Sequence, residues 1–331
     1  MNPKSSFYSG LRRWARAVCL APASRAPQLW AARRAAFFAL ALFAVTATAR
    51  AAPIAIAFGL TTGVISGQAE EIVYRNPRYS DKLSQLLWDI DALPYAGFSL
   101  DAAAAPTAGP WTIHAHAAIK FAAPMKTGNM EDRDWKYTPG KLSEYSIHQN
   151  NTQSATLGAA SAGVAWTITP AIALRAALAY KYIDYAFTAT GGTYSYRAPS
   201  PPIETVVAYS QTWHILTPAL SLIAHAGPRL AAEATLKITP LVWCTAVDKH
   251  LLTDATYTDA MTGLIYISPS AAVSYTPIPP ITITATASYT SITGARGDTT
   301  TNKTSIPPTV DTAGASYHAF DVSLTASFNF K

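Results

Sequence analysis

The feature that most constrains the fold is a strict alternation of apolar with polar or small side chains in several segments of the chain. The clearest segments are residues 111–121, 230–238, 281–290 and 321–330. Successive side chains of an extended strand point to opposite faces, so each segment has one apolar and one polar face. The alternation therefore predicts an all-β protein built from long strands.

A soluble β-sandwich also alternates, but the length and polarity of these segments argue against it. The segments are about ten residues long or longer, whereas strands of soluble sheets usually have about 5–6 residues. Their polar faces carry Thr, Ser, Lys, Glu and His, which suits the wet interior of a barrel. We therefore favour a barrel over a sandwich.

The connections between the strands are expected to alternate in length. Short turns that contain proline fall at residues 106–110, 169–170, 227–228 and 277–280. Longer polar loops cover residues 75–82, 124–152, 188–202, 246–263 and 293–316. Only a closed barrel satisfies every backbone polar group of strands inside lipid. These features predict a ten-stranded antiparallel transmembrane β-barrel with short periplasmic turns and long extracellular loops.

The first 51 residues have the composition of an export signal. Residues 1–34 are basic and contain no acid, and residues 35–45 form an apolar run of the length of a signal-peptide core. Ala49 and Ala51 are small residues at the positions that a signal peptidase recognises, so we expect cleavage after Ala51, or alternatively after Ala49. A membrane-anchoring helix is the competing interpretation, but the run is shorter than the roughly 20 residues that such a helix needs.

Residues 52–331 then form a single outer-membrane barrel domain whose charge differs from that of the whole chain. The chain has 25 Lys and Arg against 19 Asp and Glu, a formal net charge of +6. Lys4 and seven arginines precede residue 52, which leaves 17 basic residues against 19 acidic ones, or −2. A nucleic-acid partner is therefore not expected. This part of the chain keeps one thiol, Cys244, and so no internal disulfide.

Two short constellations in the predicted long loops carry chemistry. Asp132 and Asp134 are two residues apart, as are Asp248 and His250, and in an extended chain such residues share a face. A carboxylate beside an imidazole orients the ring and raises its pKa, and two neighbouring carboxylates do not both ionise freely. Across a groove, the two pairs would hold a water molecule between a base and an acid, which suffices for peptide hydrolysis without a covalent intermediate.

Other chemistries lack their residues in this sequence. No run rich in Asp and Asn ends in the Glu of a calcium loop, and no Cys/His spacing suggests zinc. A Gly-x-Ser-x-Gly context for a serine nucleophile is also missing. We therefore expect no metal and no cofactor. Each acidic pair taken alone is equally compatible with solvated loop charge.

Residues 128–135, Gly-Asn-Met-Glu-Asp-Arg-Asp-Trp, resemble the signature loop of the omptin family of outer-membrane endopeptidases, Gly-Asn-Met-x-Asp-x-Asp-Trp. The Asp248-x-His250 pair is similar to the second catalytic pair of that family. The similarity is collinear over about residues 55–331. It includes Ser66-Gly67, Glu71, Val73-Tyr74, Ser84-Gln85-Leu86, Phe187-Thr188-Ala189, Gly191-Gly192 and Tyr194.

The resemblance implies a barrel that rises above the membrane and cleaves polypeptides in a groove at its extracellular rim. It implies that His250, paired with Asp248, is the general base for water, as in an aspartic-type (Asp/His) endopeptidase. Asp132 and Asp134 would be the opposing pair that holds water and handles the proton. The positions that would contact substrate are Glu71, Met130, His148 and Ala246, although an exposed loop histidine is an equal interpretation of His148.

Two departures from the omptin pattern concern specificity and lipid. Members that cleave between basic residues use two acids to hold the incoming Arg or Lys. One of these acids aligns with Glu71, but the other falls at Ala246. Because one carboxylate is lost, we expect the enzyme to tolerate an uncharged substrate residue at the position that the two acids would hold. Family members also require lipopolysaccharide; Tyr180 matches that site, whereas Asp184 stands where an arginine is expected and repels phosphate. Lipid A is then bound elsewhere, or the membrane presents a different lipid.

The alternative function is a non-enzymatic barrel on the same scaffold, either a narrow porin or an adhesin. Retention of Asp132, Asp134, Asp248 and His250 argues for the enzyme. Closed barrels can stand alone, so a monomer is the expected state. Its expected partners are polypeptide substrates and outer-membrane lipid or lipopolysaccharide.

Overall fold

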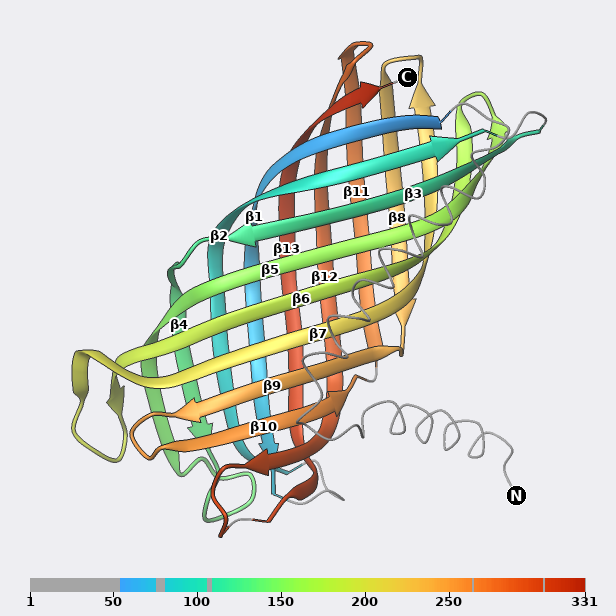
Figure 1. Ribbon diagram of the computed structural model, residues 1–331. Helices are drawn as coiled ribbons and strands as arrows, with labels where there is room; N and C mark the ends of the chain where they lie inside the picture. The colour runs from blue at the N-terminus through green and yellow to red at the C-terminus, as the bar shows by residue number, and fades with distance from the viewer. Residues whose placement is uncertain (1–53, 76–80, 106–108, 264, 306, 331) are drawn as a thin grey trace, which may run out of the picture. The chain divides into compact units, whose positions relative to one another are not determined.

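The computed structural model describes residues 54–75, 81–105, 109–263, 265–305 and 307–330, so the predicted signal peptide lies outside the described residues. The described chain forms one antiparallel sheet of thirteen strands (Figure 1). Their bounds are β1 Ile54–Tyr74, β2 Lys82–Ala104, β3 Trp111–Ala122, β4 Met125–Asp134, β5 Glu144–Thr169, β6 Ile172–Tyr194, β7 Ser200–Ala226, β8 Leu230–Thr239, β9 Val242–His250, β10 Ala255–Thr262, β11 Ile265–Ile278, β12 Ile281–Thr301 and β13 Thr309–Phe330.

The sheet closes on itself, because the first strand pairs with the last. β1 pairs with β13 from Ile56↔Phe330 to Val73↔Ala313, and with β2 on its other side. Every other strand also has a neighbour on each side among the described residues. The predicted antiparallel β-barrel is therefore confirmed.

The structure has thirteen strands where ten were predicted, because three of the long strands are interrupted. β3 and β4 both lie between β2 and β5, and β8 and β9 both pair with β7. β10 and β11 both pair with β12. Pro124 and Pro240 stand at two of the breaks, where a residue without an N–H donor cannot continue the ladder.

Strands end and begin on either side of the predicted short turns, but four of the five predicted long loops are shorter than expected. β5 begins at Glu144 and β9 ends at His250, so much of the predicted loops 124–152 and 246–263 is strand. The predicted loops 188–202 and 293–316 are also shortened, since β6 continues to Tyr194 and β12 to Thr301, whereas the loop predicted at 75–82 lies between β1 and β2 as expected. Asp132, Asp134, Asp248 and His250 therefore lie on strands and not in loops, which corrects the prediction. The outward side chains of these segments are no longer consistently apolar. Apolar alternation in the sequence therefore did not mark these segments as strands.

The apolar faces of the alternating segments point outward. They form a belt of exposed large side chains, which we call the apolar belt: Phe58, Leu60, Phe98, Leu100, Ile119, Val164, Leu178, Leu222, Leu236, Val273, Ile283 and Leu324. Such a belt is the lipid-facing surface of an outer-membrane barrel. No helix among the described residues is long and apolar enough to cross a membrane.

The polar faces point inward and are paired at the level of the apolar belt. Lys120 Nζ lies 2.6 Å from Asp321 Oδ2 and donates to Tyr95 at 2.9 Å. Arg175 forms an ion pair with Glu233. Acidic side chains in this part of the interior are therefore paired with basic ones.

Aromatic rings from different walls meet inside the barrel beyond the apolar belt. Trp88 of β2 stacks on Tyr209 of β7 at 5.3 Å between ring centroids, and on Phe187 of β6 at 5.5 Å. Tyr185 of β6 contacts Tyr317 of β13 at 5.8 Å. These five side chains are almost fully buried. The rings therefore fill the interior at this level and support the end of the barrel that carries β4, β9 and β10, which we call the rim (Figure 1).

Candidate active site

The Gly-Asn pair of residues 128–135 determines which face β4 turns inward. The register of β4 with β5 shifts between Lys126 and Asn129. Gly128 lies within this bulge at φ +95°, and a Cβ there would lie 2.5 Å from Asp91 Oδ2, so only glycine fits. The Asn129 N–H then donates to Asp89 Oδ2 at 3.2 Å. The two contacts fix β4 against β2 just before its acidic residues.

Asp132 and Asp134 share the inner face of β4, two residues apart as predicted. Asp134 is buried and Asp132 is half-buried. Burial, followed by the charge of Asp134, raises the pKa of Asp132 to about 7, against the opposing charges of His250 and Lys136. The Asp132 carboxyl group therefore exchanges its proton near neutral pH.

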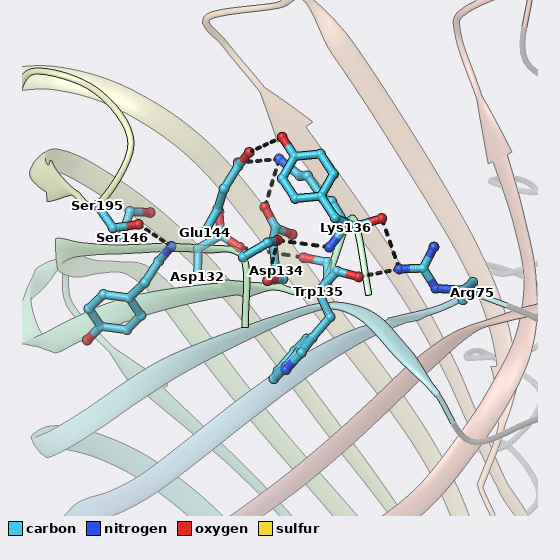
Figure 2. A network of polar contacts seen from close by, with 12 residues as sticks. Arg75, Asp132, Asp134, Trp135, Lys136, Glu144, Ser146 and Ser195 are labelled. Carbon is cyan, nitrogen blue, oxygen red and sulfur yellow. Dashed lines mark hydrogen bonds and ion pairs between the residues drawn. The ribbon is translucent and has the colours of Figure 1, made fainter. Parts of the chain in front are cut away.

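Lys136 pairs with the other carboxylate of this pair (Figure 2). Its Nζ lies 2.9 Å from Asp134 Oδ2 and 2.5 Å from Glu144 Oε2. Burial alone lowers the pKa of Lys136, but hydrogen bonds to Glu144 and Asp134, and their charges, raise it above its ordinary value. Lys136 is therefore a cation that stabilises negative charge on Asp134, and its charge also lowers the pKa of Asp132.

The segment that follows β4 is held by backbone contacts. Arg75 donates to the carbonyl groups of Trp135 and Lys136, as Figure 2 shows. Ser143 Oγ donates to the carbonyl oxygen of Asp134 at 2.9 Å and accepts from the Lys136 N–H at 2.9 Å. These contacts hold the backbone from Asp134 to Lys136.

Asp248 and His250 share the inner face of β9 and contact each other directly. Nε2 of His250 lies 2.6 Å from Oδ2 of the buried Asp248. Burial lowers the pKa of His250, but the hydrogen bond and charge of Asp248, with the charges of Asp132 and Asp134, raise it above its ordinary value. When Nε2–H donates to Asp248, the lone pair of the neutral ring is on Nδ1.

The two pairs come from different walls and act on each other. β4 lies between β2 and β5, whereas β9 lies between β7 and β10. The charge of His250 lowers the pKa of Asp132, and the charge of Asp132 raises that of His250. The structure therefore brings the four predicted side chains within electrostatic reach at the rim.

Three further inward positions adjoin the dyad, and one of them was missed by the sequence analysis. Glu71 of β1 and Ala246 of β9 are both buried. Asp259 of β10, also buried, lies opposite Ala246 in the β9–β10 register. The only sequence signal for Asp259 is its place in the alternation of Tyr257, Asp259 and Met261. No sequence spacing shows that it faces Ala246.

His148 and Met130 lie beneath the site as parts of the packed interior. His148 Nδ1 donates to the Gly191 carbonyl at 2.6 Å, and its Nε2 accepts from Ser146 at 2.8 Å. A Cβ on Gly192, which has φ +126°, would lie 2.2 Å from His148 Nδ1. Both ring nitrogens are thus occupied, and Met130 is fully buried. His148 is therefore a buried strand residue and not an exposed loop histidine.

Tyr180 lies on the outer wall, away from this cluster. Its hydroxyl is 2.6 Å from Nδ1 of His214, and Tyr182 contacts the same ring at 5.3 Å between centroids. Thr212 donates to Asp184 on the same wall. The structure thus separates the lipid-related position from the catalytic candidates. Among the described residues, no three His, Cys, Asp or Glu side chains are arranged to hold a metal ion.

Comparisons with known proteins agree with this architecture. The sequence model of the Omptin family matches residues 52–330. The outer membrane protease IcsP of Shigella flexneri is 25% identical over 267 residues, which cover 75% of this chain and 80% of IcsP. The crystal structure of the outer membrane protease OmpT from Escherichia coli has a TM-score of 0.75 at 20% identity, over 83% of this chain and 97% of OmpT. The likeness to OmpT shows the fold, an outer-membrane β-barrel.

Proposed function

Because this chain belongs to the omptin family, we propose that it is an outer-membrane endopeptidase that hydrolyses polypeptides in a groove at the extracellular rim. In this proposal, water is activated between the Asp248–His250 dyad and the opposing pair of Asp132 and Asp134, so the enzyme is of the aspartic type. The names of IcsP and OmpT, both outer membrane proteases, support the reaction class. The observation that carries the mechanism is the 2.6 Å contact between Nε2 of His250 and Oδ2 of the buried Asp248, at the same rim as Asp132 and Asp134.

The first step is attack of water on the substrate carbonyl carbon. His250 Nδ1 takes one proton from the water, whose oxygen forms the new C–O bond. Asp248 accepts the hydrogen bond from Nε2 at 2.6 Å, which orients the ring and stabilises the imidazolium that forms. Positioned general bases of this kind accelerate reactions by about 10²–10⁴-fold.

The second step is cleavage of the C–N bond. Asp132 gives its proton to the leaving nitrogen, since its pKa of about 7 allows it to act as an acid near neutral pH. Lys136, 2.9 Å from Asp134, keeps the negative charge of the pair on Asp134. After cleavage His250 carries the proton taken from water and Asp132 has lost its own. Transfer of one proton from His250 to Asp132, directly or through solvent, restores the starting state, so one water is consumed for each bond cleaved.

A porin needs an open channel, but side chains from different walls meet inside this barrel. Trp88 of β2 and Tyr209 of β7 stack across the barrel at 5.3 Å between ring centroids. Gln211 of β7 donates to the carbonyl oxygen of Glu70 on β1 at 3.1 Å. Contacts between distant walls fill the space that a pore would need. An adhesin remains the non-enzymatic alternative, and it would not need the acid–imidazole arrangement.

The test is cleavage of a degenerate peptide library by the purified protein and by a His250→Ala variant. We expect the variant to lose cleavage by about 10²–10⁴-fold, because the general base is removed. His318→Ala is the matched control, since His318 is exposed on β13 outside the site. Barrel folding is followed by heat-dependent gel mobility and circular dichroism in the same samples. An inert wild-type protein, or full activity in the variant, contradicts the proposal.

A further inference from the structure

Two lysine side chains inside the barrel differ from the other inward cations at the level of the apolar belt, because neither has a carboxylate partner. Lys181 lies on the inner face of β6 and Lys237 on the inner face of β8. No ion pair within the described part of the chain includes either lysine. The acids whose charges reach them, Asp321 and Glu233, each pair with a different cation.

Lys181 reaches across the interior of the barrel toward Lys237. Its Nζ donates to Oγ1 of Thr290 on β12 at 2.7 Å, although β6 and β12 are not neighbours in the sheet (Figure 1). Oγ1 of Thr290 lies 3.4 Å from Oγ of Ser268 on β11. Ser268 is the register partner of Lys237 on β8, and the charges of the two lysines act on each other. Two ammonium groups and two buried hydroxyl groups therefore meet from four strands.

The hydroxyl group of Tyr266 is a further donor at this place. Tyr266 is fully buried on β11, and Lys181 Nζ lies 5.9 Å from the centre of its ring. The hydroxyl oxygen is buried near Ser268 but makes no hydrogen bond of normal geometry with any described residue. Buried polar atoms are almost always satisfied in folded proteins. An unsatisfied hydroxyl group beside two unpaired cations indicates a group that arrives from outside.

Solvent reaches this part of the interior from the end of the barrel opposite the rim. Lys181 precedes Tyr185 by four residues on the inner face of β6, so it lies on the side of the stacked aromatic rings that faces away from the rim. Further toward that end, the side chains of Asp101 and His116 are 49% and 40% exposed although they point inward. Small ions therefore have access to the two lysines without passing the rim.

The donors at this place determine the chemistry of the group that they would bind. Two like charges repel each other strongly where water is scarce, and an anion between them removes this repulsion. Lysine ammonium and hydroxyl groups are single-point donors, whereas carboxylates and phosphates are typically held by the planar fork of arginine. A small spherical anion fits such donors best.

We propose that Lys181 and Lys237 bind a small inorganic anion of halide size inside the barrel, below the aromatic rings. The hydroxyl groups of Tyr266, Ser268 and Thr290 complete this site. The anion joins β6, β8, β11 and β12, and it thereby stabilises the folded barrel. The site is separate from the rim, so the inference does not depend on the proposed proteolytic function.

The experiment measures urea unfolding of the purified protein in a non-ionic detergent by circular dichroism and gel mobility. Sodium chloride, sodium bromide and sodium gluconate are compared at equal ionic strength. Gluconate carries the same charge as the halides but is much larger, so it controls for general screening. The wild type is compared with Lys181→Met and Lys237→Met. Lys141→Met is the matched control, because Lys141 is exposed between β4 and β5.

We expect the wild type to be more stable in chloride or bromide than in gluconate. An anion that binds only the folded state raises the folding equilibrium constant about tenfold when its concentration is ten times its Kd. Each interior lysine variant should lose most of this response. Lys237→Met should also unfold at higher urea than the wild type in gluconate, because the repulsion between the two lysines is gone. Lys141→Met should respond as the wild type does.

Crystals of the wild type soaked in bromide provide a measurement that does not depend on the folding of a variant. Anomalous diffraction should place a bromide ion between Lys181, Lys237 and Tyr266. Equal stability of the wild type in halide and gluconate overturns the inference, and a bromide peak without a difference in stability is binding at crystal concentration only and also overturns it. A halide response that both lysine variants retain overturns it as well, because the anion then acts elsewhere.

Discussion

The barrel treats charge differently at its two levels. At the level of the apolar belt, inward carboxylates are paired with cations, as in Asp321 with Lys120 and Glu233 with Arg175. At the rim, Glu71, Asp248 and Asp259 each keep a buried oxygen without a hydrogen bond. Both sets occupy the same structural position, the inner face of a closed sheet. The backbone arrangement is therefore the same at both levels, and the two levels differ in whether the inward carboxylates have a partner.

This contrast shows that buried carboxylates that reduce stability are concentrated at the rim. A buried carboxylate without a partner lowers the free energy of unfolding by about 1–3 kcal/mol. A barrel that neutralises such groups at one level but gathers them at the other keeps them for binding or chemistry. The same substitution, Asp to Asn, should therefore have opposite consequences at the two levels.

The largest effect is expected for Asp248→Asn at the rim. The substitution removes the charge that orients His250, so cleavage should fall by about 10²–10⁴-fold with little change in unfolding midpoint. Because Asp248 raises the pKa of His250, that pKa should fall in the variant. His250 must be neutral to act as a base, so the acid limb of the residual activity should move to lower pH. An unchanged pH profile contradicts this role.

An intermediate effect is expected for Asp321→Asn at the level of the belt. Asp321 accepts from Tyr95 at 2.5 Å and from Lys120 at 2.6 Å, so the variant leaves Lys120 without its counter-ion. The free energy of unfolding in detergent should fall by about 1–3 kcal/mol, as measured by denaturant titration, while cleavage per folded molecule is unchanged. The double variant with Lys120→Met should regain most of the loss. A loss of cleavage per folded molecule would remove the distinction between the two levels.

The smallest effect is expected for Lys136→Met, which removes the cation that pairs with Asp134. The charge of Lys136 lowers the pKa of Asp132, so that pKa should rise in the variant. Asp132 acts as an acid only while protonated, so the alkaline limb of activity should move to higher pH. The shift should be well under one pH unit because Lys136 is partly exposed. A pH–rate profile measures it, and a shift to lower pH would contradict the assignment.

Strand pattern and acidic spacing were predictable because both are local. Alternation along 281–290 and 321–330 is a property of neighbouring residues, and it gave the inner and outer faces of β12 and β13. The two-residue spacing likewise placed Asp132 beside Asp134, and Asp248 beside His250, on one face. Loop lengths were not predictable from apolar alternation, because strands that continue beyond the lipid no longer need an apolar outer face.

The sequence by itself determined that the chain is a barrel and that two acidic pairs each share a strand face, since side-chain direction in a strand depends only on residue parity. Only the tertiary structure decided that Asp132 acts on His250, that Lys136 pairs with Asp134, and that Asp259 stands opposite Ala246. These contacts join strands that meet through sheet closure and register. Sheet closure and strand register depend on how all the strands of the barrel pair, and residue spacing within one segment does not determine this.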